Sequence, residues 1–300
     1  MPELPEVEVV RSGLAPVLEG ATLARVQVLD PRSLKRHLGP HESFVDELEG
    51  ARLEVPLRRG KFLWVPIARS DRALVCHLGM SGQVLLGEDT SDFGSHLRIL
   101  FELEEARLGA TRVGFVDQRI FGSMAIDDVL DTGDTRPAGF GGVDSRVPIS
   151  VAHIARDPLD PAFDAAGFSR KLRAKNTEIK RALLDQTLIS GIGNIYADEA
   201  LWATKLHYRA STPSLRPARV QELVEAVQSV LTKALAEGGT SFDQQYVNVN
   251  GVSGYFSHSL NAYGRAGQAC PRCQSILVRE PWMNRSSHRC PRCQRTPRSR

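Results

Sequence analysis

The stretches Cys270-Pro-Arg-Cys273 and Cys290-Pro-Arg-Cys293 are two identical knuckles, separated by sixteen residues near the end of a 300-residue chain. Each knuckle places two thiolates on one tight turn, and the separation is typical of four-cysteine zinc sites. The segment between them is long enough for a two-stranded hairpin that returns the second pair to the metal. This part of the fold is therefore predicted to be a hairpin held together by one Zn²⁺ ion.

Disulfide bonds are the alternative for these cysteines, and the rest of the chain argues against them. The sequence shows no secretory signal and no membrane span, which predicts a cytoplasmic protein with reduced thiols. The one further cysteine, Cys76, lies in an apolar run and is predicted to be a buried strand residue. Eight arginines and one acidic residue, Glu280, occur from position 272 to the end, which indicates a phosphate-contacting surface although the net charge is only +3.

Upstream of the zinc module, the hydrophobic pattern changes once. Between about residues 20 and 126, short β-branched runs such as 23–28, 62–65 and 97–101 alternate with turn residues, which favours a β-sandwich. Further along, apolar residues between positions 220 and 235 recur at helical spacing behind Pro217, and two glycines follow. The expected fold is α+β, with an N-terminal β-sandwich domain and a C-terminal helical domain that carries the zinc-finger β-hairpin.

Domain boundaries follow from the same change of pattern. Residues 1–130 are predicted to form an N-terminal helix and the β-sandwich, and the stretch 131–161, rich in Gly, Pro and Asp, a linker. Residues 162–265 are expected to be the helical domain, 266–295 the zinc finger and 296–300 a tail. The chain is long enough for two domains with their own cores plus the metal module.

The first residues of the chain, from Met1 to Glu6, carry a possible nucleophile. Removal of Met1 would leave Pro2 as a secondary amine, and α-amino groups titrate near ~8, so a neutral fraction could attack a carbon and form a Schiff base. Glu3 and Glu6 could then serve as proton donor and orienting group. The same residues also suit a helix start, where proline and acidic side chains are ordinary. From these residues alone both interpretations stay open.

A second motif, Gly191-Ile-Gly-Asn194, lies between two helical patterns and suits a tight turn whose second helix begins at Asn194. Asparagine is a good N-cap, and the exposed amides of a helix start bind phosphate. A capped turn between two helices is also a common structural element. The motif alone therefore allows either a DNA contact or a purely structural turn.

Ordered motifs along nearly the whole chain resemble those of one family. They are Pro2-Glu-Leu-Pro-Glu6, Arg58-Arg-Gly-Lys61, His77-Leu-Gly-Met80-Ser-Gly, Asp117-Gln-Arg119-Ile-Phe121-Gly, Ile179-Lys180, Leu184-Asp-Gln186, Gly191-Ile-Gly-Asn194-Ile-Tyr196, Tyr246-Val-Asn-Val-Asn-Gly251, Ser259-Leu-Asn-Ala-Tyr-Gly-Arg265 and the two cysteine pairs. Through them the chain resembles the bacterial formamidopyrimidine-DNA glycosylases, within the wider family that includes endonuclease VIII. The resemblance implies a helix–two-turns–helix element in the helical domain.

The resemblance also implies an activity and its residues. It implies a bifunctional DNA glycosylase and abasic-site lyase that acts on damaged double-stranded DNA. Pro2 would attack C1′ of the damaged nucleotide and Glu3 would protonate the opening sugar, with Glu6 in the same site. Lys61 and Arg285 would donate protons in successive β- and δ-eliminations, although the high pKa of a guanidinium favours phosphate clamping for Arg285. Further DNA-contacting positions of the family match Lys175, Lys180 and Asn194.

An enzyme that extrudes a base from duplex DNA must fill the gap it leaves. Met80, Arg119 and Phe121 match the void-filling residues of the family. A thioether and an aromatic ring can replace lost stacking, while a guanidinium can hydrogen-bond to the orphaned base. Composition alone would instead place Met80 and Phe121 in a core.

Two regions depart from the pattern of the family. His96 matches a DNA-contacting histidine, but residues 94–97 lack the second histidine often seen there. Gln118 and Ile120 replace the proline and arginine that are common beside Arg119. These departures bear on the local phosphate contacts and leave the void-filling residues in place.

Two features favour oxidised purines, 8-oxoguanine and formamidopyrimidines, as substrates. Leu4 stands where the endonuclease VIII branch commonly has glycine, and the stretch 241–256 is placed where oxidised-purine enzymes carry a base-capping loop. An endonuclease VIII-type enzyme for oxidised pyrimidines is the nearer alternative. A non-catalytic zinc-ribbon DNA-binding protein is the more distant one, and it would have no need of a terminal Pro2. We expect a monomer at the bacterial nucleoid, without a nucleotide cofactor and away from membranes.

Overall fold

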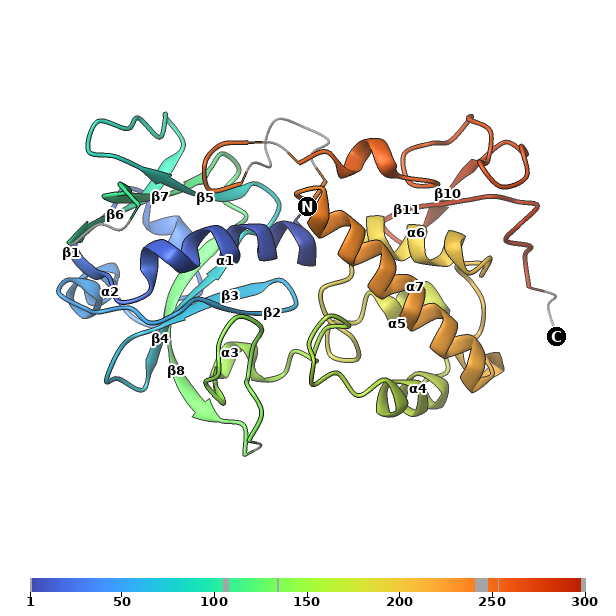
Figure 1. Cartoon of the computed structure of the whole chain (residues 1–300), viewed down its shortest axis with the longest axis horizontal. Helices are drawn as coiled ribbons and strands as arrows, with labels where there is room; N and C mark the ends of the chain where they lie inside the picture. Colours follow the sequence, from blue (N-terminus) through green and yellow to red (C-terminus); the bar gives the residue numbers. More distant parts are fainter. Residues whose placement is uncertain (1, 105–107, 134, 241–247, 253, 298–300) are drawn as a thin grey trace. The chain divides into compact units, whose positions relative to one another are not determined.

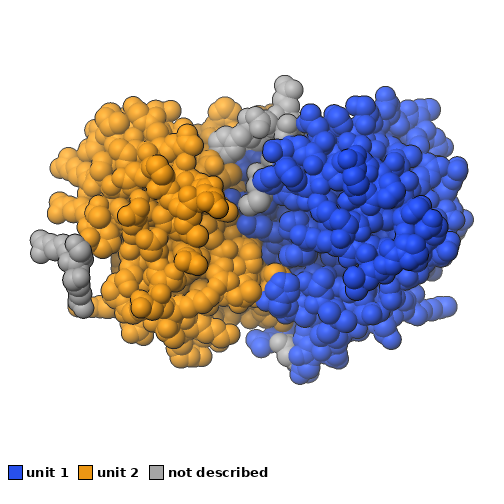
Figure 2. Space-filling view, turned by 180° about the vertical axis from the view of Figure 1, so that it is seen from behind, with its two compact units in different colours: residues 1–153, 238–254 blue, residues 154–237, 255–300 orange. Residues whose placement is uncertain are grey.

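The computed structural model describes residues 2–104, 108–133, 135–240, 248–252 and 254–297 (Figure 1). The chain forms two compact units, shown in blue and orange in Figure 2. Unit 1 consists of residues 1–153 and 238–254, and unit 2 of residues 154–237 and 255–300. The stretch 131–161, expected as a linker, contains a short strand and a short helix of unit 1 and the change of unit after His153. Every helix in the described ranges is too short or too polar to cross a membrane.

Unit 1 begins with a long helix and continues as two antiparallel sheets. Its helical segments are α1 (Leu4–Leu18), η1 (Pro31–Leu34), α2 (His41–Leu48) and α3 (Ile149–Ala152). One sheet has the order β1 (Thr22–Val28), β6 (Leu97–Glu104), β7 (Arg112–Asp117), β5 (Gly82–Gly87). The other has the order β2 (Leu57–Arg59), β3 (Phe62–Pro66), β4 (Arg72–His77), β8 (Ser123–Asp131), β9 (Arg146–Pro148). The three runs quoted from the sequence are β1, β3 and β6, and the predicted β-sandwich is confirmed.

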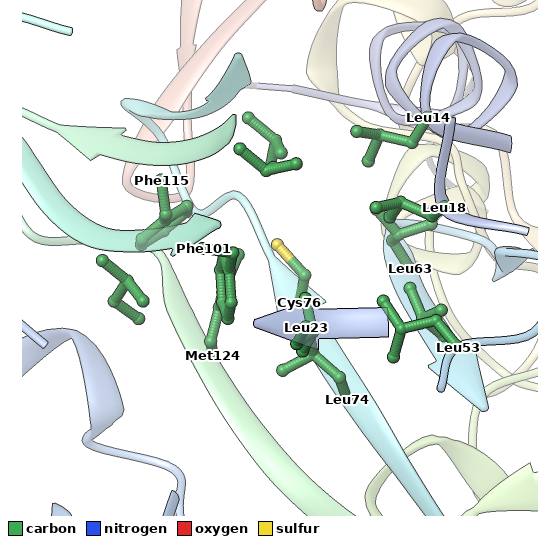
Figure 3. Packing of buried hydrophobic residues seen from close by; sticks show 14 of the residues in the cluster. Leu14, Leu18, Leu23, Leu53, Leu63, Leu74, Cys76, Phe101, Phe115 and Met124 are labelled. Carbon is green, nitrogen blue, oxygen red and sulfur yellow. The ribbon is translucent and has the colours of Figure 1, made fainter. Parts of the chain in front are cut away.

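The two sheets and α1 share one hydrophobic core. Leu14 and Leu18 of α1 belong to the same buried cluster as Leu63 of β3 and Phe101 of β6 (Figure 3). Removal of such side chains from water stabilises the fold by about 25 cal/mol per Å² of apolar surface. Cys76 of β4 is part of this core, as predicted, and burial raises the pKa of its thiol to about 12. It is therefore a packing residue and no nucleophile.

Two loops carry the chain from one sheet to the other at the same end of the sandwich. Residues 78–81 connect β4 to β5, and residues 118–122 connect β7 to β8. His77 of β4 pairs with Ser123 of β8, and Gly82 of β5 pairs with Asp117 of β7. Because both ends of each loop are paired with the ends of the other, the two loops must lie side by side.

Unit 2 is helical and includes a two-stranded hairpin. Its elements are α4 (Ala165–Ala174), α5 (Ile179–Leu183), α6 (Asn194–Ala203), η2 (Thr212–Ser214), α7 (Pro217–Ala236), η3 (Phe256–Ser259), β10 (Val278–Trp282) and β11 (Arg285–Arg289). Helix α7 starts at Pro217 as predicted and buries Val220, Leu223 and Val227. It ends before Gly238 and Gly239, whose φ values of 77° and 85° a glycine adopts without steric cost.

Candidate functional site

Three buried residues lie at the start of α1 in unit 1. Pro2 is buried, and Glu3 and Glu6 are 1% and 7% exposed. Glu3 is the N-cap residue, and the Glu6 carboxylate accepts a hydrogen bond from the Glu3 N–H at 2.8 Å, as in a capping box. The helix start predicted here is confirmed. The capping box also fixes where the Glu3 and Glu6 side chains lie.

Glu6 also holds a distant segment of unit 1 against this turn. The Thr240 N–H and hydroxyl donate to Glu6 Oε1 at 2.7 and 2.8 Å. Gly239 lies so close that a Cβ there would be 3.1 Å from the same oxygen. Residues 241–247, which follow, lie outside the described residues, so the predicted base-capping loop at 241–256 stays a prediction.

Lys61 lies half-buried in the turn between β2 and β3, and a buried ion pair connects this region to α1. The Glu8 carboxylate of α1 accepts from Arg58 Nε of β2 at 2.8 Å, and Arg58 also donates to the Gly60 carbonyl at 3.1 Å. A charge-assisted bond between buried groups has strict geometry. It therefore fixes the turn that carries Lys61 relative to the helix that begins after Pro2.

His77, at the end of β4, is a site residue that the sequence reasoning did not single out. Its ring packs against Phe62 with centroids 4.7 Å apart. Burial and three nearby cations lower the pKa of His77 to about 4, so the imidazole is neutral at pH 7. The cations are Arg36, Lys61 and Lys35. Only the pairing of β3 with β4 brings His77 beside the Lys61 turn, which no local signal in the sequence announces.

The three predicted void-filling residues lie on the two loops that cross between the sheets. Met80 and Phe121 are 36% and 39% exposed, so the core-packing alternative does not apply to them. The Arg119 guanidinium lies over the Phe121 ring, 4.6 Å from its centroid. A Cβ on Gly79, whose φ is 63°, would come within 2.3 Å of the Phe121 carbonyl carbon. The structure thus brings an exposed thioether, an aromatic ring and a cation to one edge of unit 1.

In unit 2, the Asp198 carboxylate of α6 organises the β10–β11 hairpin. Asp198 is 1% exposed and accepts from Lys180 Nζ at 2.6 Å. It also accepts from the Ser287 hydroxyl at 2.9 Å and the His288 N–H at 2.8 Å. Lys180 is fully buried and donates to the Ser286 carbonyl at 3.1 Å. Two buried opposite charges therefore compensate each other inside a hydrogen-bonded cluster.

Asn194 joins the same cluster from the first turn of α6. Its Nδ2 donates to the Ser286 carbonyl at 3.1 Å, and the N-cap of the helix is Gly193, one residue before the expected cap. The amide thus holds the hairpin and does not cap its own helix. Arg285, next to Ser286, is exposed. The structure thus brings Asn194 and Lys180 to the residue next to Arg285. Because Lys180 is fully buried, its direct contact with DNA stays a prediction.

The four cysteines of the two knuckles form one cluster at the base of the hairpin. Their Sγ atoms all lie within 4.8 Å of one another, and all four are free thiols: Cys270, Cys273, Cys290 and Cys293. Zn–S bonds of about 2.3 Å in a tetrahedron place sulfurs about 3.8 Å apart, so this donor set fits a zinc ion. Trp202 of α6 donates to Cys270 Sγ at 3.5 Å and anchors the cluster to the helix. The cluster is able to bind a metal.

Two further predicted DNA contacts lie outside these clusters within their own units. His96 precedes β6 in unit 1, where its carbonyl accepts from the Asp117 N–H at 2.9 Å and its ring is half-buried near Arg98. Lys175 is the C-cap residue of α4 in unit 2, and its exposed ammonium pairs with Asp185. For both residues the contact with DNA stays a prediction.

Family comparison matches both units. Residues 1–124 match the model of the formamidopyrimidine-DNA glycosylase N-terminal domain, and residues 154–245 match that of the formamidopyrimidine-DNA glycosylase H2TH domain. The chain belongs to the formamidopyrimidine-DNA glycosylase family. The first match covers α1 and most of the β-sandwich of this glycosylase. A zinc-ribbon DNA-binding module would not need such a domain.

Relatives of this glycosylase match it over their whole length. A formamidopyrimidine-DNA glycosylase from Leifsonia xyli subsp. xyli is 57% identical over 296 residues, covering 98% of this chain and 100% of the relative. One from Streptomyces avermitilis is 53% identical over 298 residues, covering 99% of each. A solved complex of Lactococcus lactis Fpg with DNA containing an abasic site has a TM-score of 0.80 at 28% identity, covering 98% of this chain and 100% of that chain. The family recognised from the motifs is confirmed.

Proposed function

We propose that this glycosylase removes 8-oxoguanine and formamidopyrimidines from damaged duplex DNA and then cleaves the strand at the resulting abasic site. The observation that carries the proposal is the buried start of α1, where Pro2 precedes the carboxylates of Glu3 and Glu6. The lesion class is supported by solved neighbours: an L. lactis Fpg mutant bound to Fapy-dG-containing DNA and MutM bound to carbocyclic 8-oxo-G-containing DNA. Both have 28% identity to this chain, with TM-scores of 0.81 and 0.80.

Base removal uses the Pro2 amine after Met1 has been cleaved. The nitrogen attacks C1′, the bond from C1′ to the base breaks, and the base leaves with a proton. Glu3 then protonates O4′ as the sugar ring opens, which leaves an iminium between Pro2 and C1′. Glu6 has its oxygens engaged by the Glu3 N–H and by Thr240, so we assign it the role of positioning the helix start.

Strand cleavage uses the iminium as an electron sink. Loss of a proton from C2′ expels the 3′ phosphate, and a second elimination expels the 5′ phosphate, leaving a one-nucleoside gap. Lys61, held near α1 through the Glu8–Arg58 ion pair, is proposed as the proton donor of the first elimination. For Arg285 we propose phosphate clamping, because a guanidinium stays protonated throughout the physiological range.

The DNA is proposed to be held from both units. Met80 and Phe121 would fill the gap left by the extruded base, and Arg119 would donate to the acceptors of an orphaned cytosine, which adenine does not offer in the same pattern. Asn194 and Arg285 would hold backbone phosphates. We propose zinc as the metal of the cysteine cluster, where it would fix the hairpin and take no part in the chemistry.

A lesion panel tests this function. Purified protein would be given duplex oligonucleotides with 8-oxoguanine or formamidopyrimidine opposite cytosine, 8-oxoguanine opposite adenine, thymine glycol or dihydrouracil. Both purine lesions opposite cytosine are expected to be released faster than the pyrimidine lesions, and 8-oxoguanine opposite adenine should be disfavoured. Faster turnover of the oxidised pyrimidines than of both purine lesions would instead support the endonuclease VIII alternative.

A further inference from the structure

The carboxylate of Asp117 joins the two loops that carry the void-filling residues. Asp117 is fully buried at the end of β7. Its Oδ1 accepts from the Ser81 hydroxyl at 2.5 Å and from the N–H groups of Arg119 and Ile120 at 3.2 and 3.0 Å. Its Oδ2 accepts from the Gly122 N–H at 2.7 Å. One side chain thus binds both ends of the 118–122 loop and the turn at 78–81.

This buried charge forms no ion pair with any residue that the structure describes. The guanidinium of Arg98 donates to the main-chain carbonyl of Asp117 at 2.8 Å and pairs with Asp30. The carboxylate is therefore compensated by three backbone N–H groups and one hydroxyl, an arrangement that stabilises anions through converging dipoles. Such donors converge only when the loop has this particular backbone conformation. The carboxylate consequently favours one conformation of the loop over all others.

The loop needs such a restraint because of Ile120. Its φ of 54° lies in the left-handed region, which a β-branched residue avoids because of steric strain. The residue is held from both sides, since its N–H donates to Asp117 and its carbonyl accepts from Lys35 Nζ at 2.8 Å. The backbone turn at Ile120 sets the directions of its two neighbours, Arg119 and Phe121.

We propose that Asp117 is a positioning residue that presets Met80, Arg119 and Phe121 for entry into the duplex. The inference rests on the proposed function, in which these three side chains brace the gap left by an extruded base. With the carboxylate present, the two loops enter DNA as one rigid element. Without it, the loop relaxes toward a conformation in which Ile120 is unstrained. Extrusion of a stacked base and reading of its partner then suffer most, whereas a site without a base needs no unstacking.

Asp117→Asn is the direct test, because the amide nitrogen must replace an oxygen that now accepts N–H groups. We expect kcat/KM for 8-oxoguanine opposite cytosine to fall about tenfold to a hundredfold, as for a buried donor left unsatisfied. Cleavage of a preformed abasic site should stay within about threefold, and the preference for cytosine over adenine opposite the lesion should shrink. The fluorescence of 2-aminopurine beside the lesion should show slower or smaller unstacking. Ser81→Ala, which keeps the carboxylate and removes one bond, should shift the same ratios by less.

Val113→Ala is the matched control, because it truncates a buried core residue of the same strand, β7, far along it from the loop. It should lower stability while leaving both activity ratios unchanged. If Asp117→Asn and Ser81→Ala lower base excision and abasic-site cleavage by equal factors, as a general loss of stability would, the proposal is wrong. A parent enzyme that excises neither purine lesion would contradict the proposed function itself and this role of Asp117 with it.

Discussion

Two buried aspartates hold the segments that we propose to contact DNA, and their charges are compensated in different ways. In unit 1, Asp117 is surrounded by backbone N–H groups and the Ser81 hydroxyl. In unit 2, Asp198 pairs with the buried ammonium of Lys180 and accepts further bonds from the hairpin. The first arrangement depends on one loop conformation, and the second depends on one lysine.

The difference follows from what each segment can offer. The 118–122 loop is a tight turn whose amides are free to converge on a carboxylate. In β11, alternate amides pair with β10, and of the rest His288 reaches Asp198. The Lys180 ammonium therefore compensates the part of the Asp198 charge that the N–H groups of β11 cannot. The hairpin is therefore sensitive to loss of a charge partner, whereas the loop is sensitive to changes in backbone geometry.

The largest effect is expected from removal of the metal that we propose for unit 2. Structural zinc in comparable sites contributes on the order of 10 kcal/mol, so Cys290→Ser should unfold the hairpin and displace Arg285. DNA binding should fall, while unit 1 stays folded because it has a hydrophobic core of its own. Elemental analysis should find one zinc per chain in the parent and in a Cys76→Ala control. A metal-free protein with full activity would refute the zinc assignment.

Asp198→Asn should have the next largest effect. It leaves the Lys180 ammonium buried without its partner, which costs about 3–5 kcal/mol, whereas loss of one acceptor at Asp117 costs about 1–3 kcal/mol. Urea unfolding followed by tryptophan fluorescence would report on unit 2 in a Trp64→Phe background, which keeps Trp202 and Trp282. The double variant Trp202→Phe/Trp282→Phe keeps Trp64 and would report on unit 1 for Asp117→Asn. Adding Lys180→Met should recover part of the loss. Equal losses of unfolding free energy in Asp198→Asn and Asp117→Asn would show that the two carboxylates are compensated in equivalent ways.

Acid should weaken unit 1 through His77, a group of different chemistry from the two carboxylates. The folded-state pKa of about 4 lies below the ordinary 6.5, so the unfolded chain takes up the proton first as the pH falls. The contribution of neutral His77 to the free energy of unfolding is complete above pH 6.5 and is lost between pH 6.5 and pH 4. It amounts to on the order of 1–3 kcal/mol. Urea midpoints across this range should show the decrease. In His77→Asn, whose Oδ1 can replace Nδ1 as the acceptor of the Gly79 N–H, this part of the pH dependence should disappear.

The smallest effect concerns the salt dependence of DNA binding. Lys61→Gln in unit 1 or Arg285→Gln in unit 2 should reduce the slope of log K against log salt by about one counterion each. Asn194→Ala should weaken binding with little change of slope, because it removes a neutral donor. Titrations at several salt concentrations would measure this. Unchanged affinity in all three variants would place the DNA elsewhere on the protein.

Local patterns predicted a large part of this molecule. Strand runs, the start of α7 and the two cysteine knuckles each depend on neighbours close in sequence, so they could be read directly. His77 was not recognised as a site residue, because the pairing of β3 with β4 places it beside Phe62 and the Lys61 turn. The role of Asp117 depends on Ser81, which the pairing of β5 with β7 brings to it, and on a loop conformation that no local pattern specifies. Lys180 was predicted to contact DNA, and its burial, unusual for a lysine, depends on Asp198, eighteen residues further along.

Trapping of the covalent intermediate tests the central claim, that Pro2 is the nucleophile, most directly. Processed protein incubated with 8-oxoguanine duplex and borohydride should yield a stable protein–DNA adduct, because reduction converts the iminium to an amine. The same protein with Met1 retained, or with an extended N-terminus, should yield none, since the Pro2 nitrogen is then an amide. Equal trapping of DNA by the Met1-retaining protein would contradict the account.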